Sequence, residues 1–449
     1  MRLAQLLVYV FAFPSFVFAS HDIEKTVLDN GLTVLVRPLP SSGVVSIYAY
    51  VKAGSATEDK FMGKGISHFV EHMLFKGTDK RPVGAIAKEI QSLGGNINAS
   101  TTLDYTMVTL DVPKGEFQRG LDILSDMLMN SVFDPAQVEK EREVIHGEMR
   151  LYNDRPDRRL SRDVLRNVYI RHPYRHPIIG YLPLFDSITR EELYAYYRSR
   201  YIPNNIILSV TGAVDLNETM SSIKTAFKDF RPLVYPERAI SPEPPQISQR
   251  YYEEYYQTPL FRFSLAFQGV ALTDPDLYAL DVLAMALGQG EGSRLYEIIY
   301  KKKNLVHQIS SSNFTPLDKG ILEIEGVMDK DNLSQVLAAV KDIAGDIKRR
   351  GLSSEELAKT KRRCLSQFVF GNQTSSNLAY RAAMDEAASG DPEFSRHYVQ
   401  AVKNVTNEDI KRVAKMYLVD SALSITILKP IAGNGRGLHL AGNGRDRSL

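Results

Sequence analysis

The residues that decide the fold lie in segment 65–75, which reads Gly-Ile-Ser-His-Phe-Val-Glu-His-Met-Leu-Phe. A helix is expected over about 64–75, because its apolar side chains recur with helical spacing. His68 and His72 stand four residues apart, so both imidazoles project from one helix face and can bind one metal ion. Glu71 lies one turn after His68, where its carboxylate can take a proton from an attacking water. On the motif alone, a solvated polar helix face is the alternative interpretation.

A catalytic zinc site has three protein ligands and an open position, so another element must supply a further ligand. The helix that follows is expected to begin at Asp134-Pro135, an N-cap followed by proline at the first helical position, and to end near residue 152. One face of this helix combines apolar residues with two glutamates: Val138, Glu141, Ile145, Glu148 and Tyr152. Two carboxylates on an apolar face need compensation, which a bound cation provides. Without the first motif, both glutamates would be expected to face solvent.

The composition limits the class of protein. A chain of 449 residues exceeds one compact core, so two or three domains are expected. Apolar residues make up 44% and charged residues 24%, which argues against wholesale disorder and against a polytopic membrane protein. The 55 basic and 53 acidic residues give a net charge of +2, so no nucleic-acid partner is expected. Cys364 is the only cysteine, so a metal site must use histidines and carboxylates.

Residues 1–19 are expected to be a signal peptide. Arg2 is followed by an uncharged apolar stretch, and Val17-Phe18-Ala19 fits the small-residue rule of signal peptidase. Cleavage is expected after Ala19, with an uncleaved N-terminal anchor as the alternative. No other segment is expected to cross a membrane, so the mature chain should have no stable span. Export of a chain without disulfides favours a bacterial periplasm.

A proline-rich segment, 232–248, divides the mature chain into similar halves. Five prolines fall within fourteen of its residues, a composition typical of an extended linker. The expected domains are therefore 20–231 and 249–430. Residues 431–449 carry a repeated Ala-Gly-Asn-Gly-Arg motif with almost nothing to bury, and they are expected to form a disordered tail.

The two halves repeat one order of elements. In the N-terminal half, a hairpin expected over 26–36 and a strand over 44–51 precede the helix with the histidines. In the C-terminal half, alternation over 261–267 precedes an apolar helix over 277–287. We interpret this order as a diverged internal duplication. Strands mixed with amphipathic helices predict two α+β domains, each a mixed, mainly antiparallel sheet covered by helices.

Together these residues resemble the pitrilysin family of inverzincin metallopeptidases, specifically its short-chain branch, which includes the β subunit of mitochondrial processing peptidase. The resemblance covers nearly the whole mature chain and rests on five segments: 28–32, 65–73, 94–99, 141–144 and 201–205. It implies that His68, His72 and Glu148 bind Zn²⁺ and that Glu71 is the catalytic base. It also implies that Glu141 orients the site from behind the ligands.

The resemblance further implies how substrate reaches the site. The strand near Asn98, Ala99 and Ser100 would be the sheet edge that pairs with an extended peptide. The two domains would enclose a clam-like chamber, so short or unfolded peptides are the expected substrates.

The sequence differs from the family pattern at two positions, and this difference bears on whether the chain works without a partner. Active members of the family place an arginine and, seven residues later, a tyrosine in the second domain, and here those positions hold Tyr300 and His307. Both can still donate hydrogen bonds to a substrate oxyanion, so they are kept as candidate substrate-binding residues. The departure favours a homologous partner subunit that supplies the missing pair, or a homodimer. A non-catalytic subunit or scaffold is the alternative function.

Overall fold

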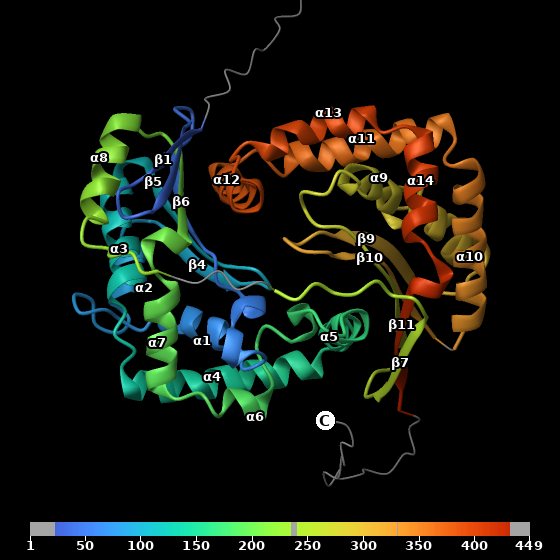
Figure 1. The fold of residues 1–449 in the computed structure, drawn as a ribbon, viewed down its shortest axis with the longest axis horizontal. Coiled ribbons are helices and arrows are strands. Elements are labelled where there is room, and N and C mark those ends of the chain that lie inside the picture. The colour runs from blue at the N-terminus through green and yellow to red at the C-terminus, as the bar shows by residue number, and fades with distance from the viewer. Residues whose placement is uncertain (1–22, 235–239, 330, 432–449) are drawn as a thin grey trace, which may run out of the picture.

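The computed structural model describes residues 23–234, 240–329 and 331–431 (Figure 1). The expected signal peptide at 1–19 lies outside the described residues, as does all but the first residue of the expected tail at 431–449. In the described part of the chain, no helix is both long and apolar enough to span a membrane.

The first half of the chain forms a six-stranded mixed sheet. Its strands, in spatial order, are β1 (Glu24–Val27), β2 (Thr33–Pro38), β6 (Ile206–Gly212), β3 (Val44–Val51), β5 (Thr106–Pro113) and β4 (Asn96–Thr101). Only the β2–β6 pair is parallel among these described strands, with Val34 opposite Leu208. Strand β4 is outermost, and it follows the helix that carries the two histidines.

Helices from the same half cover one face of this sheet and enclose its main apolar core. They are α1 (Ile66–Met73), α2 (Ala85–Ser92), α3 (Phe117–Asn130), α4 (Pro135–Asp154), α6 (Leu182–Phe185), α7 (Arg190–Arg200) and α8 (Leu216–Ala226). The expected helices at 64–75 and 134–152 correspond to α1 and α4, and the expected strand at 44–51 corresponds to β3.

The second half repeats this architecture with five strands. Their spatial order is β7 (Arg250–Tyr256), β11 (Leu423–Pro430), β8 (Phe261–Gln268), β10 (Ile321–Met328) and β9 (Gln308–Phe314). One face is covered by α9 (Leu277–Gly288), α10 (Leu333–Arg350), α11 (Ser354–Phe370), α13 (His397–Asn404) and α14 (Asn407–Tyr417). The outermost strand β9 holds the place that β4 holds in the first sheet.

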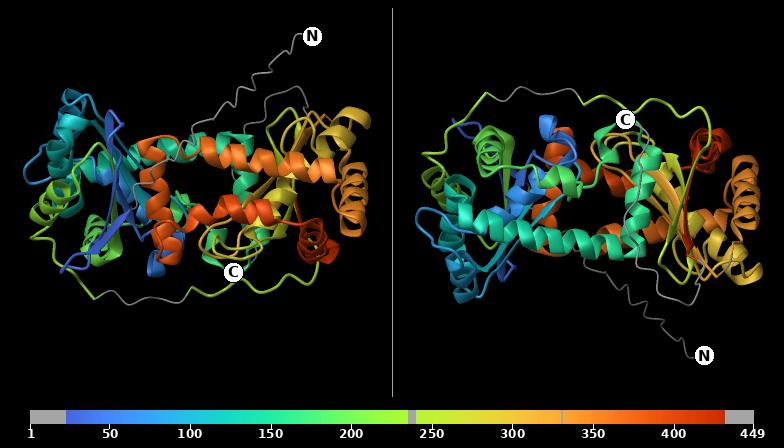
Figure 2. Two further views of the ribbon diagram at one scale, coloured as in Figure 1. Left: turned by 90° about the horizontal axis from the view of Figure 1, so that it is seen from above. Right: turned by 90° about the horizontal axis from the view of Figure 1, so that it is seen from below.

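The two halves exchange one helix each across the second face of their sheets (Figures 1 and 2). Helix α12 (Ser375–Ser389), from the C-terminal half, lies on the first sheet, where Ala382 and Ala383 belong to the same apolar cluster as Tyr50 of β3. Helix α5 (Pro156–Val168), from the N-terminal half, lies on the second sheet with Val164 and Val168 buried. Because both faces of β3 are covered, residues 45–51 are buried without alternation.

The proline-rich segment forms no helix or strand in its described residues, 232–234 and 240–248, but it is fixed to the first half of the chain. The buried Glu243 accepts hydrogen bonds from the backbone N–H groups of Ile170, Arg171 and His172 at 2.8–2.9 Å. This part of the segment is therefore held against the protein surface rather than free.

Candidate metal centre

Helix α1 presents His68, Glu71 and His72 because its opposite face is fully buried. Phe69 and Val70 belong to the main core, so the remaining face of the helix carries the polar side chains. The helix begins after Gly65, whose φ is 74°. A Cβ at this position would lie 2.4 Å from the carbonyl oxygen of Ile179, so only glycine allows this close approach.

Helix α4 brings the distal glutamates to α1. The carboxylate of Asp134 accepts a hydrogen bond from the backbone N–H of Gln137 at 3.0 Å, and proline occupies the first helical position. Val138 and Ile145 are buried in the main core, which fixes the rotation of the helix. Glu141 is buried on the same face, whereas the side chain of Glu148 is 41% exposed.

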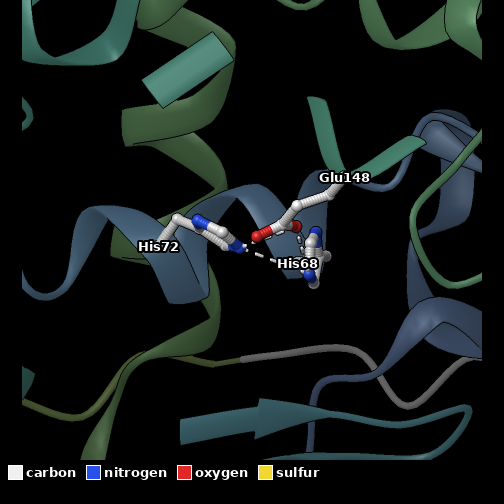
Figure 3. Close-up of side chains that lie close together, drawn as sticks. All are labelled: His68, His72 and Glu148. Atoms are coloured by element: carbon white, nitrogen blue, oxygen red, sulfur yellow. Dashed lines mark hydrogen bonds and ion pairs between the residues drawn. The ribbon is translucent and has the colours of Figure 1, made fainter. Parts of the chain in front are cut away.

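The side chains of His68, His72 and Glu148 meet as the sequence predicts for a metal site (Figure 3). Nε2 of His72 lies 3.3 Å from Nε2 of His68. Oε2 of Glu148 lies 3.5 Å from Nε2 of His72 and 3.8 Å from Nε2 of His68. One donor atom from each of these three residues lies within 4.8 Å of the other two. The exposed side of Glu148 leaves the cluster open to a water or substrate.

The protonation of the two imidazoles fits a cation between them. Nδ1 of His72 donates a hydrogen bond to Oε1 of Glu141 at 2.9 Å, which leaves a lone pair on Nε2 facing the cluster. Burial, together with the neighbouring His72, lowers the pKa of His68 to about 3, so this imidazole is neutral at ordinary pH. Two imidazoles and a carboxylate form a donor set that suits Zn²⁺.

Glu141 supports this arrangement from behind His72. Its carboxylate accepts hydrogen bonds from His72 and, at 2.6 Å, from Nζ of Lys76. Burial alone would raise the pKa of Glu141, but these two contacts outweigh it and hold the pKa below its usual value. Burial also lowers the pKa of His72, yet the hydrogen bond to Glu141 and the charges of Glu148 and Glu71 raise it overall.

Glu71 is tied to the outermost strand of the sheet. The hydroxyl of Thr101, the last residue of β4, donates a hydrogen bond to Oε2 of Glu71 at 2.6 Å. Burial raises the pKa of Glu71, which is the direction that favours a proton acceptor working near neutral pH. The candidate base is therefore positioned by the same strand that is expected to bind peptide.

Asn98, Ala99 and Ser100 lie in the middle of β4. Among the described strands, β4 pairs with β5 alone, so its outer edge is available for another strand. Ala99 packs against the main core, while Asn98 and Ser100 are exposed. The edge next to the metal cluster is thus polar and accessible.

Tyr300 and His307 lie in the second half of the molecule, away from this cluster. Tyr300 belongs to a π-helix, η6 (Tyr296–Lys302), and its ring centroid is 4.7 Å from that of Tyr296. Nε2 of His307 lies 2.7 Å from Oδ1 of Asp329. Within the described ranges, no hydrogen bond, ion pair or ring contact connects either residue to the metal cluster. The structure therefore does not bring these two candidates to the site.

Two contacts at the site escape sequence reasoning. Lys76 stands four residues after His72 but beyond the end of α1 at Met73, so helical spacing does not predict its contact with Glu141. Thr101 lies in a different element, and nothing in the sequence near Glu71 indicates that contact.

Both halves of the chain match profiles of one protein family. Residues 33–181 match the profile described as Insulinase (Peptidase family M16). Residues 187–364 match the profile described as Peptidase M16 inactive domain. This division agrees with a metal cluster in the first half of the chain.

Curated relatives match over nearly the full length. The chain is 27% identical over 404 residues to the uncharacterized zinc protease YmxG of Bacillus subtilis, a match that covers 90% of this chain and 98% of that protein. It is 26% identical over 440 residues to a probable mitochondrial-processing peptidase subunit beta of Arabidopsis thaliana, covering 94% of this chain and 82% of that protein. These names confirm the predicted cofactor, Zn²⁺.

Solved structures share the fold. A protease from Helicobacter pylori superposes with a TM-score of 0.85 at 26% identity, covering 91% of this chain and all of that one. The periplasmic protease PqqL of Escherichia coli superposes with a TM-score of 0.76 at 20% identity, covering 91% of this chain but 47% of that one. The likeness confirms the predicted fold class, two α+β domains in a clam-like arrangement. The chain belongs to the pitrilysin-like peptidase family M16.

Proposed function

We propose that this protein is a zinc-dependent endopeptidase that hydrolyses short or unfolded peptides. The observation that carries the proposal is the convergence of His68, His72 and Glu148, with Glu71 tied to the end of β4. A metal-binding triad, a buried carboxylate and an accessible sheet edge are the components that peptide hydrolysis requires.

Each part of the site has a chemical role in this proposal. An extended peptide pairs with the outer edge of β4, and Asn98 and Ser100 flank its backbone. A Zn²⁺ ion bound by His68, His72 and Glu148 would supply Lewis-acid polarisation of the scissile carbonyl. Glu71 takes a proton from the attacking water and returns it to the leaving amine. Thr101 holds the Glu71 carboxylate in place, and Glu141 holds the ring of His72.

We infer that the chain acts as one half of a paired enzyme, with a homologous subunit or a second copy as partner. The length comparison supports this, since the chain spans about half of PqqL. The placement of Tyr300 and His307 also supports it, since neither contacts the cluster and a partner could supply groups that bind the oxyanion. Export to a periplasm follows from the expected signal peptide at 1–19, and the solved relative PqqL is periplasmic.

The test is hydrolysis of a quenched, unstructured peptide by the chain beginning at Ser20. We expect turnover that a chelator abolishes and Zn²⁺ restores. If the chain pairs with itself, its specific activity should rise with protein concentration. If it needs a homologous subunit, turnover should appear when that subunit is added. The matched control is Glu71→Gln, which should keep the metal and lose hydrolysis. Full turnover by that variant would refute the assignment of the base.

A non-catalytic subunit is the second candidate, and the placement of Tyr300 and His307 favours it. This role predicts zinc binding without hydrolysis under every pairing tested. Chelator-sensitive turnover would exclude it.

A further inference from the structure

A buried carboxylate near the metal helix has no role in the chemistry described so far. Glu58 is 0% exposed. Its Oε1 accepts a hydrogen bond from the backbone N–H of Ser67 at 2.9 Å, and its Oε2 accepts one from the N–H of Gly65 at 3.2 Å. Both donors lie at the start of α1, directly before His68.

Helix α1 depends on this outside carboxylate because it cannot cap itself. The first N–H groups of any helix lack partners within the helix. Here the N-cap residue is Gly65, which has no side chain to accept a hydrogen bond. The side chain of Glu58 accepts from two N–H groups there, those of Gly65 and Ser67. The helix has only eight residues, so the position of its first turn also fixes the position of His68.

The segment that carries Glu58 also holds the expected peptide-binding strand. The backbone N–H groups of Ser55 and Ala56 donate to the carbonyl oxygens of Thr102 and Leu103 at 3.1 and 2.8 Å. Thr102 follows directly on the end of β4. One short segment, 54–58, therefore joins the metal helix to the strand that positions Glu71.

A second contact strengthens the same junction. The hydroxyl of Ser67 donates to the carbonyl oxygen of Gly54 at 3.2 Å and shares a hydrogen bond with the hydroxyl of Tyr196 at 2.8 Å. The guanidinium of Arg200 lies 5.2 Å from the ring centroid of Tyr196, and its positive charge acts on Glu58. Burial raises the pKa of Glu58 to about 8, although the hydrogen bonds from Ser67 and Gly65 and the charge of Arg200 act to lower it.

We propose that Glu58 is a positioning residue for the metal centre, which it holds in register with β4 by anchoring the first turn of α1. The proposal rests on the metal centre proposed above. It predicts that loss of the Glu58 carboxylate weakens metal binding and slows turnover, whereas the KM for peptide stays close to that of the parent. A residue that only stabilises the fold would change neither metal affinity nor the shape of the site at temperatures well below unfolding.

The experiment titrates Co²⁺ into the metal-free full chain and into Glu58→Gln, with the visible absorption of the bound ion as the signature of ligand geometry. Glu58→Gln is expected to raise the Kd for Co²⁺ by about tenfold or more, as for other residues that orient metal ligands, and to alter the absorption spectrum. Glu58→Asp keeps the carboxyl group on a shorter side chain, so an intermediate Kd is expected.

Glu243→Gln is the matched control. Glu243 is also buried and also accepts backbone N–H hydrogen bonds, in its case from residues 170–172, and it lies 3.7 Å from the guanidinium of Arg250, but it belongs to the linker rather than to the segment beside α1. This variant is expected to lower the melting temperature while leaving the Kd for Co²⁺ and the spectrum unchanged.

The outcomes separate this proposal from the function on which it rests. In one outcome, the parent binds Co²⁺, and both Glu58 variants have the same Kd and absorption spectrum as the parent and the Glu243→Gln control. That outcome refutes the positioning role and leaves the metal centre in place. If the parent fails to bind Co²⁺, the metal centre itself is refuted, and the positioning role with it.

Discussion

Removal of the Glu141 carboxylate tests how the metal centre is supported. Glu141 accepts hydrogen bonds from Nδ1 of His72 at 2.9 Å and from Nζ of Lys76 at 2.6 Å, and its side chain is 8% exposed. Glu141→Ala removes both contacts and leaves a buried N–H of His72 without an acceptor. Glu141→Gln keeps an oxygen that can accept from His72 but removes the charge that pairs with Lys76.

The expected loss follows from the strength of these contacts. A hydrogen bond to a charged group contributes roughly 1.5–3 kcal/mol, and each 1.4 kcal/mol is about a tenfold change in an equilibrium constant. Glu141→Ala should therefore weaken zinc binding by roughly 10- to 100-fold, in line with substitutions of groups that orient metal ligands. Glu141→Gln should fall near the lower end, because the orientation of His72 is retained.

The assay is competition for Zn²⁺ between the chain and a chromophoric chelator of known affinity. Glu139→Gln is the control on the same helix, since Glu139 is 68% exposed and its contact with Arg142, at 3.3 Å, lies at the surface. The control should bind Zn²⁺ as the parent does. An unchanged Kd in Glu141→Ala would show that His72 needs no support from Glu141.

Three further predictions test other parts of the molecule. Thr101→Val should lower kcat about tenfold without loss of zinc. The Glu71 carboxylate loses the 2.6 Å hydrogen bond that the Thr101 hydroxyl donates to it, and such a bond contributes roughly 1.5 kcal/mol. Burial lowers the pKa of His172, so as the pH falls the unfolded chain binds a proton at this residue before the folded chain does. The melting temperature should therefore fall as the pH drops below about 6.5. His172→Gln should make the melting temperature less dependent on pH. Burial raises the pKa of Cys364 to about 12, so iodoacetamide at pH 8 should label the thiol only after unfolding.

Each of these has a contrary result. Parent-like kcat in Thr101→Val would mean that Glu71 is oriented by other contacts. Equal pH dependence of the melting temperature in the parent and in His172→Gln would remove His172 as the cause. Rapid labelling of native Cys364 would show that the α11 face is open.

The ligands of the site could be predicted from the sequence because helical spacing determines which side chains share a face. His68 and His72 stand four residues apart in α1, and Glu141 and Glu148 stand seven apart in α4, so helical spacing alone places each pair on one face. The expectation that both glutamates lie on a buried face holds for Glu141. The side chain of Glu148 is 41% exposed instead, although Ile145 and Met149 in the same half of α4 are buried in the main core.

Contacts between separate elements could not be predicted in the same way. An amphipathic pattern indicates that α5 and α12 each bury one side, but it does not say against which sheet. Glu58 meets Gly65 through a loop, and Thr101 meets Glu71 because β4 is outermost in the sheet order. Both depend on how the chain is arranged in space, which periodicity within a single element does not encode.

The exchange of α5 and α12 has a consequence for a chain cut in two. Each sheet obtains one of its two covering layers from the other half, so Val164 and Ala383 are both buried in the half to which they do not belong by sequence. A single proteolytic cleavage within 232–248 would break the covalent connection but leave both layers in place. The resulting fragments would remain associated, and neither could leave without exposing an apolar sheet face to water.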